Sequence, residues 1–387
     1  RIEREEFFSA ASFFLSSSPR PLLSTPCRLR ASPSDRQRSS FSKTEPFTRA
    51  RSLSSYKTPT KRTKKYKIKN QNSQPVSPEQ GSDAVVAAHA AGINFFDTSP
   101  YYGDTKSETV LAGGLARLDR SSFVLATKVG RYGGGNGEAS VFDFSRSRVV
   151  SSVAESMRRL KVDRIDLVQC HDVEFADDLG TVITEAIPAL LELKKQGVIG
   201  AVGVTGLPLT TLRRVIEGVG AKTTSTSSSP SPSSPSASPI DCVLSYCRCC
   251  LNDHALLEEI PYYQSQSLGI INASVLSMGL LSEAGPPSWH PAPEKLKVAA
   301  REAARVAREE FGLDLADLAI REALSTPGVA SHLIGISSAE QAEANVKAAL
   351  RALEPPTEVE AKAMARVKEV FAEVQGMSWS SGKPENC

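Results

Sequence analysis

Residues 164–204 contain, in order, RIDLVQC (164–170), LGTVITEAIPALLELKKQ (179–196) and VIGAVGV (198–204). The first and third segments are short apolar runs, which are typical of buried strands, and the middle one has the apolar spacing of an amphipathic helix. A strand, a single helix and a second strand predict a parallel βαβ unit.

The same alternation continues on both sides of this unit. We predict seven strands in all, the other five being 93–97, 123–128, 240–246, 268–273 and 331–334. Further helices are predicted at 83–91, 107–118, 145–160, 209–218, 252–265, 293–324, 339–350 and 358–374. A barrel of eight strands takes about 250 residues, so we predict an α/β fold, a (β/α)8 TIM barrel over 81–387 with its first strand missing or replaced. A doubly wound sheet is disfavoured because no strand leads into G-x-G-x-x-G.

The front of the chain differs from this body. Residues 1–80 carry 17 Lys and Arg against 6 Asp and Glu and show no sustained apolar period, so we predict a basic, disordered leader. No strand pattern is visible in 67–80, where the first barrel strand should lie. We expect the protein in the cytoplasm, or in a plastid if the leader is a transit peptide. Because no Met precedes Met157, we also expect the start of the chain to be incomplete or misassembled.

The composition excludes several classes of protein. With 40% hydrophobic and 23% charged residues the chain can bury a core, and no apolar run is long enough to span a membrane. The net charge of +3 combines a basic leader with a mildly acidic body, so we expect no nucleic-acid partner. Cys247, Cys249 and Cys250 lack a second ligand pair at zinc spacing, so we expect reduced thiols and no metal.

Two segments of the body do not fit the alternation. Residues 221–239 contain 9 Ser and 4 Pro, which predicts a solvated, disordered insertion between a helix and the next strand. The glycine-rich run 133–137 follows a strand but opens no helix, and we interpret it as a flexible loop.

Four polar residues stand at or just beyond predicted strand ends: Asp97, Tyr102, Lys128 and His171. In a parallel barrel these ends converge on one mouth, where active sites are built. Each residue alone has an ordinary structural explanation, such as a helix cap or a hydrogen-bonding His. Together they suit alcohol–carbonyl interconversion, because Asp97 can neutralise Lys128, and Lys128 can lower the pKa of a Tyr102 general acid or base.

These residues also resemble a known family. The segment GINFFDTSPYYG (92–103), with Lys128 and the strand that ends at His171, resembles the signature of the aldo-keto reductases over about residues 83–381. Other stretches, including TGLPL (205–209) and GPPSWHP (285–291), resemble plant-type members that oxidise a free sugar. The resemblance implies that Tyr102 removes the proton of the anomeric hydroxyl group of L-galactose while the C1 hydride passes to NAD, giving L-galactonolactone for ascorbate synthesis.

The resemblance further implies a nicotinamide cofactor across the barrel mouth. Its phosphates would contact the loop after the 268–273 strand and the 335–338 turn, where a helix N-terminus favours an anion. NADP-preferring members carry Lys and Arg at positions that match Gly335 and Gln341 here, and these neutral residues favour NAD. The implied cofactor residues are Thr205, Ser274, Leu276, Gly279, Leu280, Gly335, Ser337, Ser338, Gln341 and Asn345.

Two alternatives stay open beside this interpretation. One is another aldo-keto reductase that acts on aldehydes with NADPH. The other is a non-catalytic barrel that only binds the cofactor. For the favoured function we expect a small sugar as the partner molecule and a monomer or weak homo-oligomer.

Overall fold

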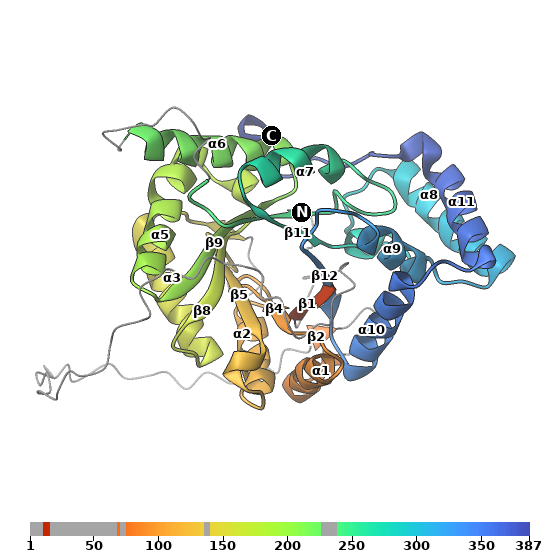
Figure 1. Ribbon diagram of the computed structural model, residues 1–387, viewed down its shortest axis with the longest axis horizontal. Coiled ribbons are helices and arrows are strands. Elements are labelled where there is room, and N and C mark those ends of the chain that lie inside the picture. Colours follow the sequence, from red (N-terminus) through yellow and green to blue (C-terminus); the bar gives the residue numbers. More distant parts are fainter. Residues whose placement is uncertain (1–10, 16–67, 70–74, 135–139, 226–237) are drawn as a thin grey trace, which may run out of the picture.

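The computed structural model describes residues 11–15, 68–69, 75–134, 140–225 and 238–387. Its centre is a ring of seven mutually parallel strands with helices outside (Figure 1). In ring order they are β12 (Ser331–Ile336), β11 (Gly269–Ala273), β10 (Cys242–Tyr246), β9 (Ile199–Gly206), β8 (Ile165–Cys170), β5 (Val124–Val129) and β4 (Phe95–Asp97). All seven predicted strands are confirmed, and the α/β barrel with them.

An eighth strand closes the ring, and it comes from the leader. β1 (Ala11–Leu15) lies between β12 and β4 and is antiparallel to both, with Phe13 opposite Ile334 on one side and Phe96 on the other. The parallel first strand is thus replaced by an antiparallel one. The prediction of a disordered leader is wrong for this segment, because ASFFL is an apolar run of strand length that two open sheet edges can pair.

The rest of the leader is described only near its end. β2 (Ile68–Lys69) pairs with β3 (Pro75–Val76) in a separate two-stranded sheet, and helix α1 (Pro78–Ala90) begins before the predicted boundary at residue 81. Ser77 and Gln80 form a reciprocal capping box and Pro78 occupies the first turn, which fixes where α1 starts. The predictions for 1–10, 16–67 and 70–74 lie outside the described residues.

Helices link successive parallel strands and cover the outside of the ring (Figure 1). They are α2 (Lys106–Leu115), α3 (Arg146–Leu160), α4 (Leu179–Thr181), α5 (Ile187–Lys195), α6 (Leu209–Ser225), α7 (Leu256–Ser265), α9 (Leu315–Leu324) and α10 (Ala339–Leu353). A π-helical turn (Val182–Ala186) joins α4 to α5. A short hairpin, β6 (Arg131–Tyr132) with β7 (Val141–Phe142), follows β5.

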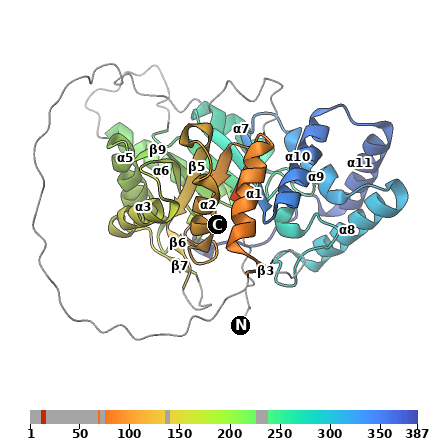
Figure 2. The ribbon, with the colours of Figure 1, turned by 90° about the horizontal axis from the view of Figure 1, so that it is seen from below.

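A second packing unit lies beside the ring. α8 (Glu294–Arg305), a π-helical turn (Val306–Glu310) and α11 (Glu358–Phe371) bury their own apolar cluster (Figure 2). The sequence predicted one helix over 293–324, whereas in the structure the helix is interrupted between Phe311 and Asp314. Gly312 supplies the break with φ +67°, a left-handed conformation that ends helices and that glycine adopts without strain.

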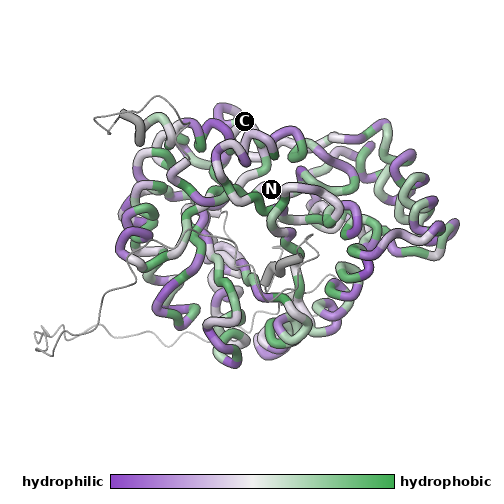
Figure 3. Tube along the Cα trace, viewed as in Figure 1, coloured by the Kyte–Doolittle hydropathy of each residue, from purple (hydrophilic) through white to green (hydrophobic). Residues whose placement is uncertain are grey.

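Besides the cluster around α8 and α11, two buried apolar clusters belong to the barrel itself. The large cluster fills the space between strands and helices, and apolar stretches accordingly run along the strands in Figure 3. A smaller cluster, Ala126, Leu167, Ala201, Cys242, Leu244, Ile271 and Leu333, joins neighbouring strands in a second buried layer. Both clusters hold the strands rigidly, so side chains at the strand ends have fixed positions.

The predicted insertion is partly helical. α6 continues to Ser225, beyond the predicted end at Gly218, so the first five residues of 221–239 extend that helix. Residues 226–237, and 135–139 of the glycine-rich loop, lie outside the described residues. Among the described residues no helix combines the length and apolar character needed to cross a membrane.

Candidate active site

Neighbouring strands bring the predicted catalytic residues together. Asp97 ends β4, Lys128 is the last residue but one of β5, and His171 follows β8 directly. These strands pair in parallel, with Asp97 opposite Ala126 and Lys128 opposite Gln169. Because parallel strands end at the same edge, these side chains meet at one mouth of the barrel.

Lys128 and Asp97 form a buried ion pair. Lys128 Nζ donates a hydrogen bond to Asp97 Oδ2 and another, of 3.0 Å, to the carbonyl of Thr98, while Gln169 Nε2 donates to Asp97 Oδ1 at 3.1 Å. Both charged side chains are 2% exposed. Burial alone would lower the pKa of Lys128, but the carboxylate of Asp97 holds it above its ordinary value. Lys128 is therefore a fixed cation inside the mouth.

Tyr102 lies against this cation and against His171. Lys128 Nζ is 4.7 Å from the centre of the Tyr102 ring, and the Tyr102 and His171 rings meet edge to face at 5.5 Å. Burial raises the pKa of Tyr102, and the opposing charge of Lys128 does not reverse this. The prediction of a lowered pKa is therefore wrong for this structure, because the desolvation of the half-buried phenol outweighs the charge of Lys128. Tyr102 holds its proton at neutral pH.

His171 is held as a neutral ring. Its Nδ1 lies 3.1 Å from Ser99 Oγ, and Ser99 Oγ already accepts a hydrogen bond from Tyr101 N–H. The Ser99 hydroxyl can therefore donate to Nδ1, which leaves the proton of the ring on Nε2. Burial lowers the pKa of His171 to about 3. The ring is thus a hydrogen-bond donor at Nε2 and not a cation.

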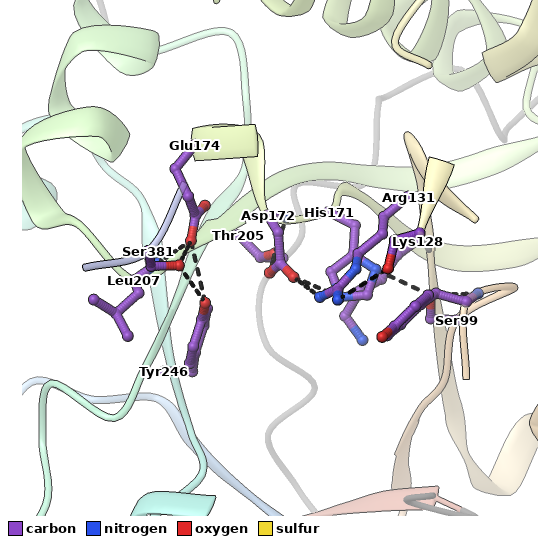
Figure 4. A network of polar contacts seen from close by, with 12 residues as sticks. Ser99, Lys128, Arg131, His171, Asp172, Glu174, Thr205, Leu207, Tyr246 and Ser381 are labelled. Carbon is purple, nitrogen blue, oxygen red and sulfur yellow. Dashed lines mark hydrogen bonds and ion pairs between the residues drawn. The ribbon is translucent and has the colours of Figure 1, made fainter. Parts of the chain in front are cut away.

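A second ion pair borders His171, and the sequence analysis missed it. Arg131 Nη1 donates to Asp172 Oδ2, and the same oxygen lies 3.7 Å from His171 Nε2 (Figure 4). The side chains of Arg131 and Asp172 are 15% and 6% exposed. The guanidinium also stacks on Tyr101, with its central carbon 3.7 Å from the ring centre. Their closeness in sequence to Lys128 and His171 was the available signal.

Glu174 is a further buried group that the sequence analysis missed. Its Oε1 accepts hydrogen bonds from Leu207 N (3.0 Å), Tyr246 OH (3.1 Å) and Ser381 Oγ (2.9 Å), as Figure 4 shows. Its Oε2 is buried with no hydrogen-bond partner among the described residues. Burial raises the pKa of Glu174 to about 7, and the charge of Asp172 adds to the effect. No sequence signal separates such a loop carboxylate from a solvated one.

The predicted cofactor residues lie at the ends of β9, β11 and β12, with β10 between the first two of these strands. Thr205, near the end of β9, accepts a hydrogen bond from Asp172 N at 2.9 Å. Its hydroxyl therefore lies beside the loop that begins with His171. The loop after β11 contains Ser274, Leu276, Gly279 and Leu280. Ser274, Ser277, Met278 and Gly279 have φ between 48° and 91° there. Non-glycine residues rarely adopt this conformation, and such strained loops cluster at ligand sites.

The third group of predicted residues forms the N-terminus of α10. Gly335 near the end of β12 is exposed, and the half-exposed Ser337 and Ser338 follow it. Ser338 caps the helix by accepting from Gln341 N at 3.2 Å, and Gln341 Oε1 accepts from Ser337 N and Ser337 Oγ, both at 2.8 Å. Asn345 lies one turn further along the helix. The Gln341 side chain is thus neutral and folded onto the turn.

Comparison with known proteins agrees with this geometry. The model of the aldo/keto reductase family matches residues 65–364. The chain belongs to the aldo/keto reductase family. L-galactose dehydrogenase of Arabidopsis thaliana is 40% identical over 81% of this chain and 90% of its own length. D-arabinose 1-dehydrogenase of Saccharomyces cerevisiae is 35% identical over 67% of this chain and 73% of its own.

Solved structures of the same family share the fold. An aldo-keto reductase of Bacillus halodurans superposes with a TM-score of 0.59 at 23% identity, over 79% of this chain and 90% of its own. A glycerol dehydrogenase of Gluconobacter oxydans gives 0.58 at 22% identity, over 81% and 97%. The resemblance to the aldo-keto reductases predicted from the sequence is therefore confirmed, and so is the barrel.

Aldo-keto reductases use nicotinamide cofactors, and the residues here fit such a group. The N-terminal turn of α10 offers backbone N–H groups and the Ser338 hydroxyl to a phosphate, whereas the Ser337 hydroxyl donates to Gln341 Oε1. Ser277 Oγ, in the strained loop after β11, is buried without a hydrogen-bond partner among the described residues. A donor left unpaired in this way costs about 1–3 kcal/mol, which a bound polar group would offset. The loop and the helix turn are thus the candidate cofactor-holding segments.

Proposed function

We propose that this protein oxidises L-galactose at C1 with NAD, giving L-galactonolactone. The observation that carries the proposal is the protonated Tyr102 between the buried Lys128–Asp97 pair and the neutral His171. This arrangement can move one proton to or from an alcohol oxygen. The 40% identity to L-galactose dehydrogenase supports a sugar as the substrate. The similarity to D-arabinose 1-dehydrogenase supports oxidation at C1.

Each residue has a definite task in the proposed reaction. His171 Nε2–H donates a hydrogen bond to the C1 hydroxyl oxygen and places it beside Tyr102. For oxidation Tyr102 first releases its own proton to solvent, and the phenolate, which Lys128 stabilises, then takes the hydroxyl proton. Asp97 holds Lys128 in place and balances its charge. When bound, the nicotinamide cofactor accepts the hydride from C1.

The cofactor preference is argued from charge. The 2′-phosphate that distinguishes NADP from NAD is best held by Arg or Lys. Gly335 has no side chain, and Gln341 is neutral with its amide oxygen already bonded to Ser337. We therefore infer a preference for NAD, with Thr205 near the carboxamide and Asn345 near the adenine end.

The first prediction concerns this preference. With L-galactose as substrate, kcat/KM should be higher with NAD than with NADP, and Gln341→Arg should move the ratio toward NADP. A charge-assisted contact of about 1.5–3 kcal/mol corresponds to roughly tenfold to a hundredfold. Steady-state kinetics with both cofactors measure the ratio, and Gln375→Arg serves as a control for added charge. Equal use of the two cofactors by the unmodified protein would contradict the assignment.

The second prediction concerns Tyr102. Tyr102→Phe should lower kcat by about 10²–10⁴, because the proton acceptor is removed while the ring is kept. Binding of NADH, followed by fluorescence, should be unchanged because the candidate phosphate contacts lie elsewhere. Tyr263→Phe is the matched control, a buried tyrosine of α7 whose hydroxyl has no hydrogen-bond partner among the described residues. A Tyr102→Phe enzyme with near-normal turnover would exclude Tyr102 as the base.

We place the reaction in ascorbate synthesis, with a small sugar as partner molecule and no nucleic acid or membrane. A monomer or weak homo-oligomer in the cytoplasm, or in a plastid, completes the proposal. Size-exclusion chromatography with light scattering and the location of a C-terminally tagged protein test these two points.

A further inference from the structure

The Arg131–Asp172 pair stands next to the reacting groups but has no part in the proton transfer described above. Asp172 follows His171 directly, and Arg131 lies three residues beyond Lys128. Asp172 Oδ2 is 3.7 Å from His171 Nε2, the nitrogen that would hold the C1 oxygen. A substrate oxygen bound to that nitrogen would bring the next carbon of the substrate, with its own substituents, close to Asp172.

The pair has hydrogen-bonding capacity to spare. An Arg side chain carries five N–H donors. Among the described residues, Arg131 donates to Asp172 and, at 3.4 Å, to Ser140 Oγ, and its Nε is buried without a partner. Asp172 Oδ1 receives one long contact, of 3.4 Å, from Thr205 Oγ1. Arg131 thus has hydrogen-bond donors left for a ligand, and the adjacent Asp172 has an acceptor oxygen left for it.

The fold holds this pair in a fixed position. Gly130, with φ +95°, packs against Phe144 so closely that a Cβ would lie 2.1 Å from the ring, and this sets the backbone just before Arg131. Asp172 is itself in the left-handed region at φ 50°. Strain of this kind collects at binding sites. Stability alone does not require it, because a buried ion pair often contributes nothing over apolar residues.

The surroundings suit a molecule with both C–H faces and hydroxyl groups. The Arg131 guanidinium carbon lies 3.7 Å from the ring centre of Tyr101, 5.5 Å from that of Phe142 and 5.8 Å from that of Phe175. Ligand sites combine apolar and aromatic walls with a few fixed polar groups. A hydroxyl group donates one hydrogen bond and accepts others, so a paired cation and anion can satisfy it completely.

We propose that Arg131 and Asp172 form a subsite for the hydroxyl group on the carbon next to the reacting carbon, and so select polyhydroxylated substrates. Arg131 donates to this hydroxyl and Asp172 accepts from it. For the sugar itself the inference rests on the proposed function, where the subsite would take the C2 hydroxyl. For smaller carbonyl compounds it stands independently, because it concerns only the group beside the reacting carbon.

The test compares substrates that differ in this one hydroxyl. In reduction with NADH, glyceraldehyde is compared with 3-hydroxypropanal; in oxidation with NAD, L-galactose is compared with 2-deoxy-L-galactose. A site built around a hydroxyl rejects the analogue that lacks it by up to about 10⁴–10⁵, so we expect kcat/KM ratios of about 10² or more. Arg131→Met should bring both ratios near unity by lowering only the values for the hydroxylated substrates.

Two further variants separate recognition from folding. Arg131→Lys keeps the charge against Asp172 but loses the planar fork, so the ratios should fall while the melting temperature and the Kd for NADH stay the same. Arg148→Met is the matched control, an arginine 4.0 Å from the ring centre of Tyr132 with an ion pair to Glu155. Its ratios should equal those of the unmodified protein.

The outcomes also distinguish this inference from the proposed function. If the glyceraldehyde ratio collapses in Arg131→Met but L-galactose is never oxidised, the subsite stands and the proposed sugar is wrong. If L-galactose is oxidised but Arg131→Met lowers kcat/KM equally for both members of each pair, Arg131 is structural and the subsite is overturned. A lack of discrimination by the unmodified protein, or turnover of neither pair, also overturns it.

Discussion

At the scale of single residues, Glu174 is a buried side chain whose charge changes near neutral pH. It is fully buried, three groups donate to one of its oxygens, and the other oxygen has no hydrogen-bond partner among the described residues. A protonated carboxyl group suits this place better than a carboxylate, because burial penalises the charge. The fold therefore favours the acid form of Glu174.

This preference predicts how stability depends on pH. The pKa of Glu174 is raised from an ordinary 4.5 to about 7, so its contribution is complete below pH 4.5 and is lost as the pH rises through 7. The loss is roughly 3 kcal/mol at about 1.36 kcal/mol per pKa unit. Glu174→Gln should flatten the fall in melting temperature between pH 5 and pH 8.

Calorimetry or circular dichroism across this pH range measures the effect. Glu373→Gln is the control, since the Glu373 side chain is 85% exposed, and its curve should follow that of the unmodified protein. If Glu174→Gln gives a curve parallel to the original, Glu174 does not carry the dependence.

The four catalytic candidates, Asp97, Tyr102, Lys128 and His171, could be predicted from the sequence. The charged residues beside them could not. Asp97 and Lys128 are charges at the ends of apolar strands, a pattern that is unusual unless the charges are paired. Arg131 begins the short strand β6 and Asp172 lies in a loop, and at such positions near the surface charged residues are common and most are solvated. Their importance comes from burial and from a contact across the mouth, which depend on the three-dimensional register of β5 and β8. The pKa direction of Tyr102 likewise depended on a burial that the sequence does not give.

At the scale of elements, β1 determines whether the barrel is closed. It pairs with β12 along five residues and with β4 along two. Without it, both neighbours would present unpaired N–H and C=O groups, each of which costs about 1–3 kcal/mol if it stays buried. The strand also flanks the site, since Ser12 is the backbone partner of Asp97.

Removal of residues 1–16 should therefore loosen two strands selectively. We expect faster amide hydrogen exchange in Phe95–Asp97 and Ser331–Ile336, with little change in β8 and β9, and a lower melting temperature. Mass spectrometry of exchange measures this strand by strand. A chain without residues 1–8 keeps β1 and is the control. Unchanged protection of β4 and β12 in the longer deletion would show that β1 does not close the ring.

The parallel elements were predictable because each shows its own period, and β1 was not. ASFFL is an isolated run in a Ser- and Arg-rich stretch, and its partners lie far along the chain, so only the geometry of the two open edges reveals it. The extension of α6 through Ala221–Ser225 was missed for a related reason. Ser and Thr are weak helix formers, and here an existing helix continues into them.

At the scale of the whole molecule, the end of the chain fastens the loop that carries the site. Ser381 donates to Glu174 Oε1, Lys383 N donates to Glu174 O at 2.9 Å, and Asn386 Nδ2 donates to Ala176 O at 2.7 Å. Thr211 on α6 donates to the carbonyl of Asn386. The C-terminus accordingly lies beside α6 in Figure 1. Residues 381–387 thus connect the loop that follows β8 to helix α6 on the outside of the barrel.

Deletion of residues 381–387 should destabilise this loop more than the barrel. The carbonyls of Glu174 and Ala176, left without these donors, should cost about 1–3 kcal/mol each where they stay buried, lowering the denaturation midpoint and speeding exchange in residues 171–176. We also expect a lower kcat/KM, because His171 begins this segment. Glu385→Ala, which keeps the backbone contact of Glu385 with Arg214, is the control. Unchanged hydrogen exchange in residues 171–176 after the deletion would show that residues 381–387 do not hold this loop in place.

The antiparallel β1 also has a consequence for the synthesis of the chain. Its partner β4 follows within the first hundred residues, but its longer pairing is with β12, in which Ala11 meets Ile336. A ribosome must therefore make almost the entire protein before the ring can close, and contacts this distant in sequence form slowly. Until then the emerging chain carries an open sheet edge that can pair with other chains. We expect newly made protein to depend on chaperones until translation has passed β12.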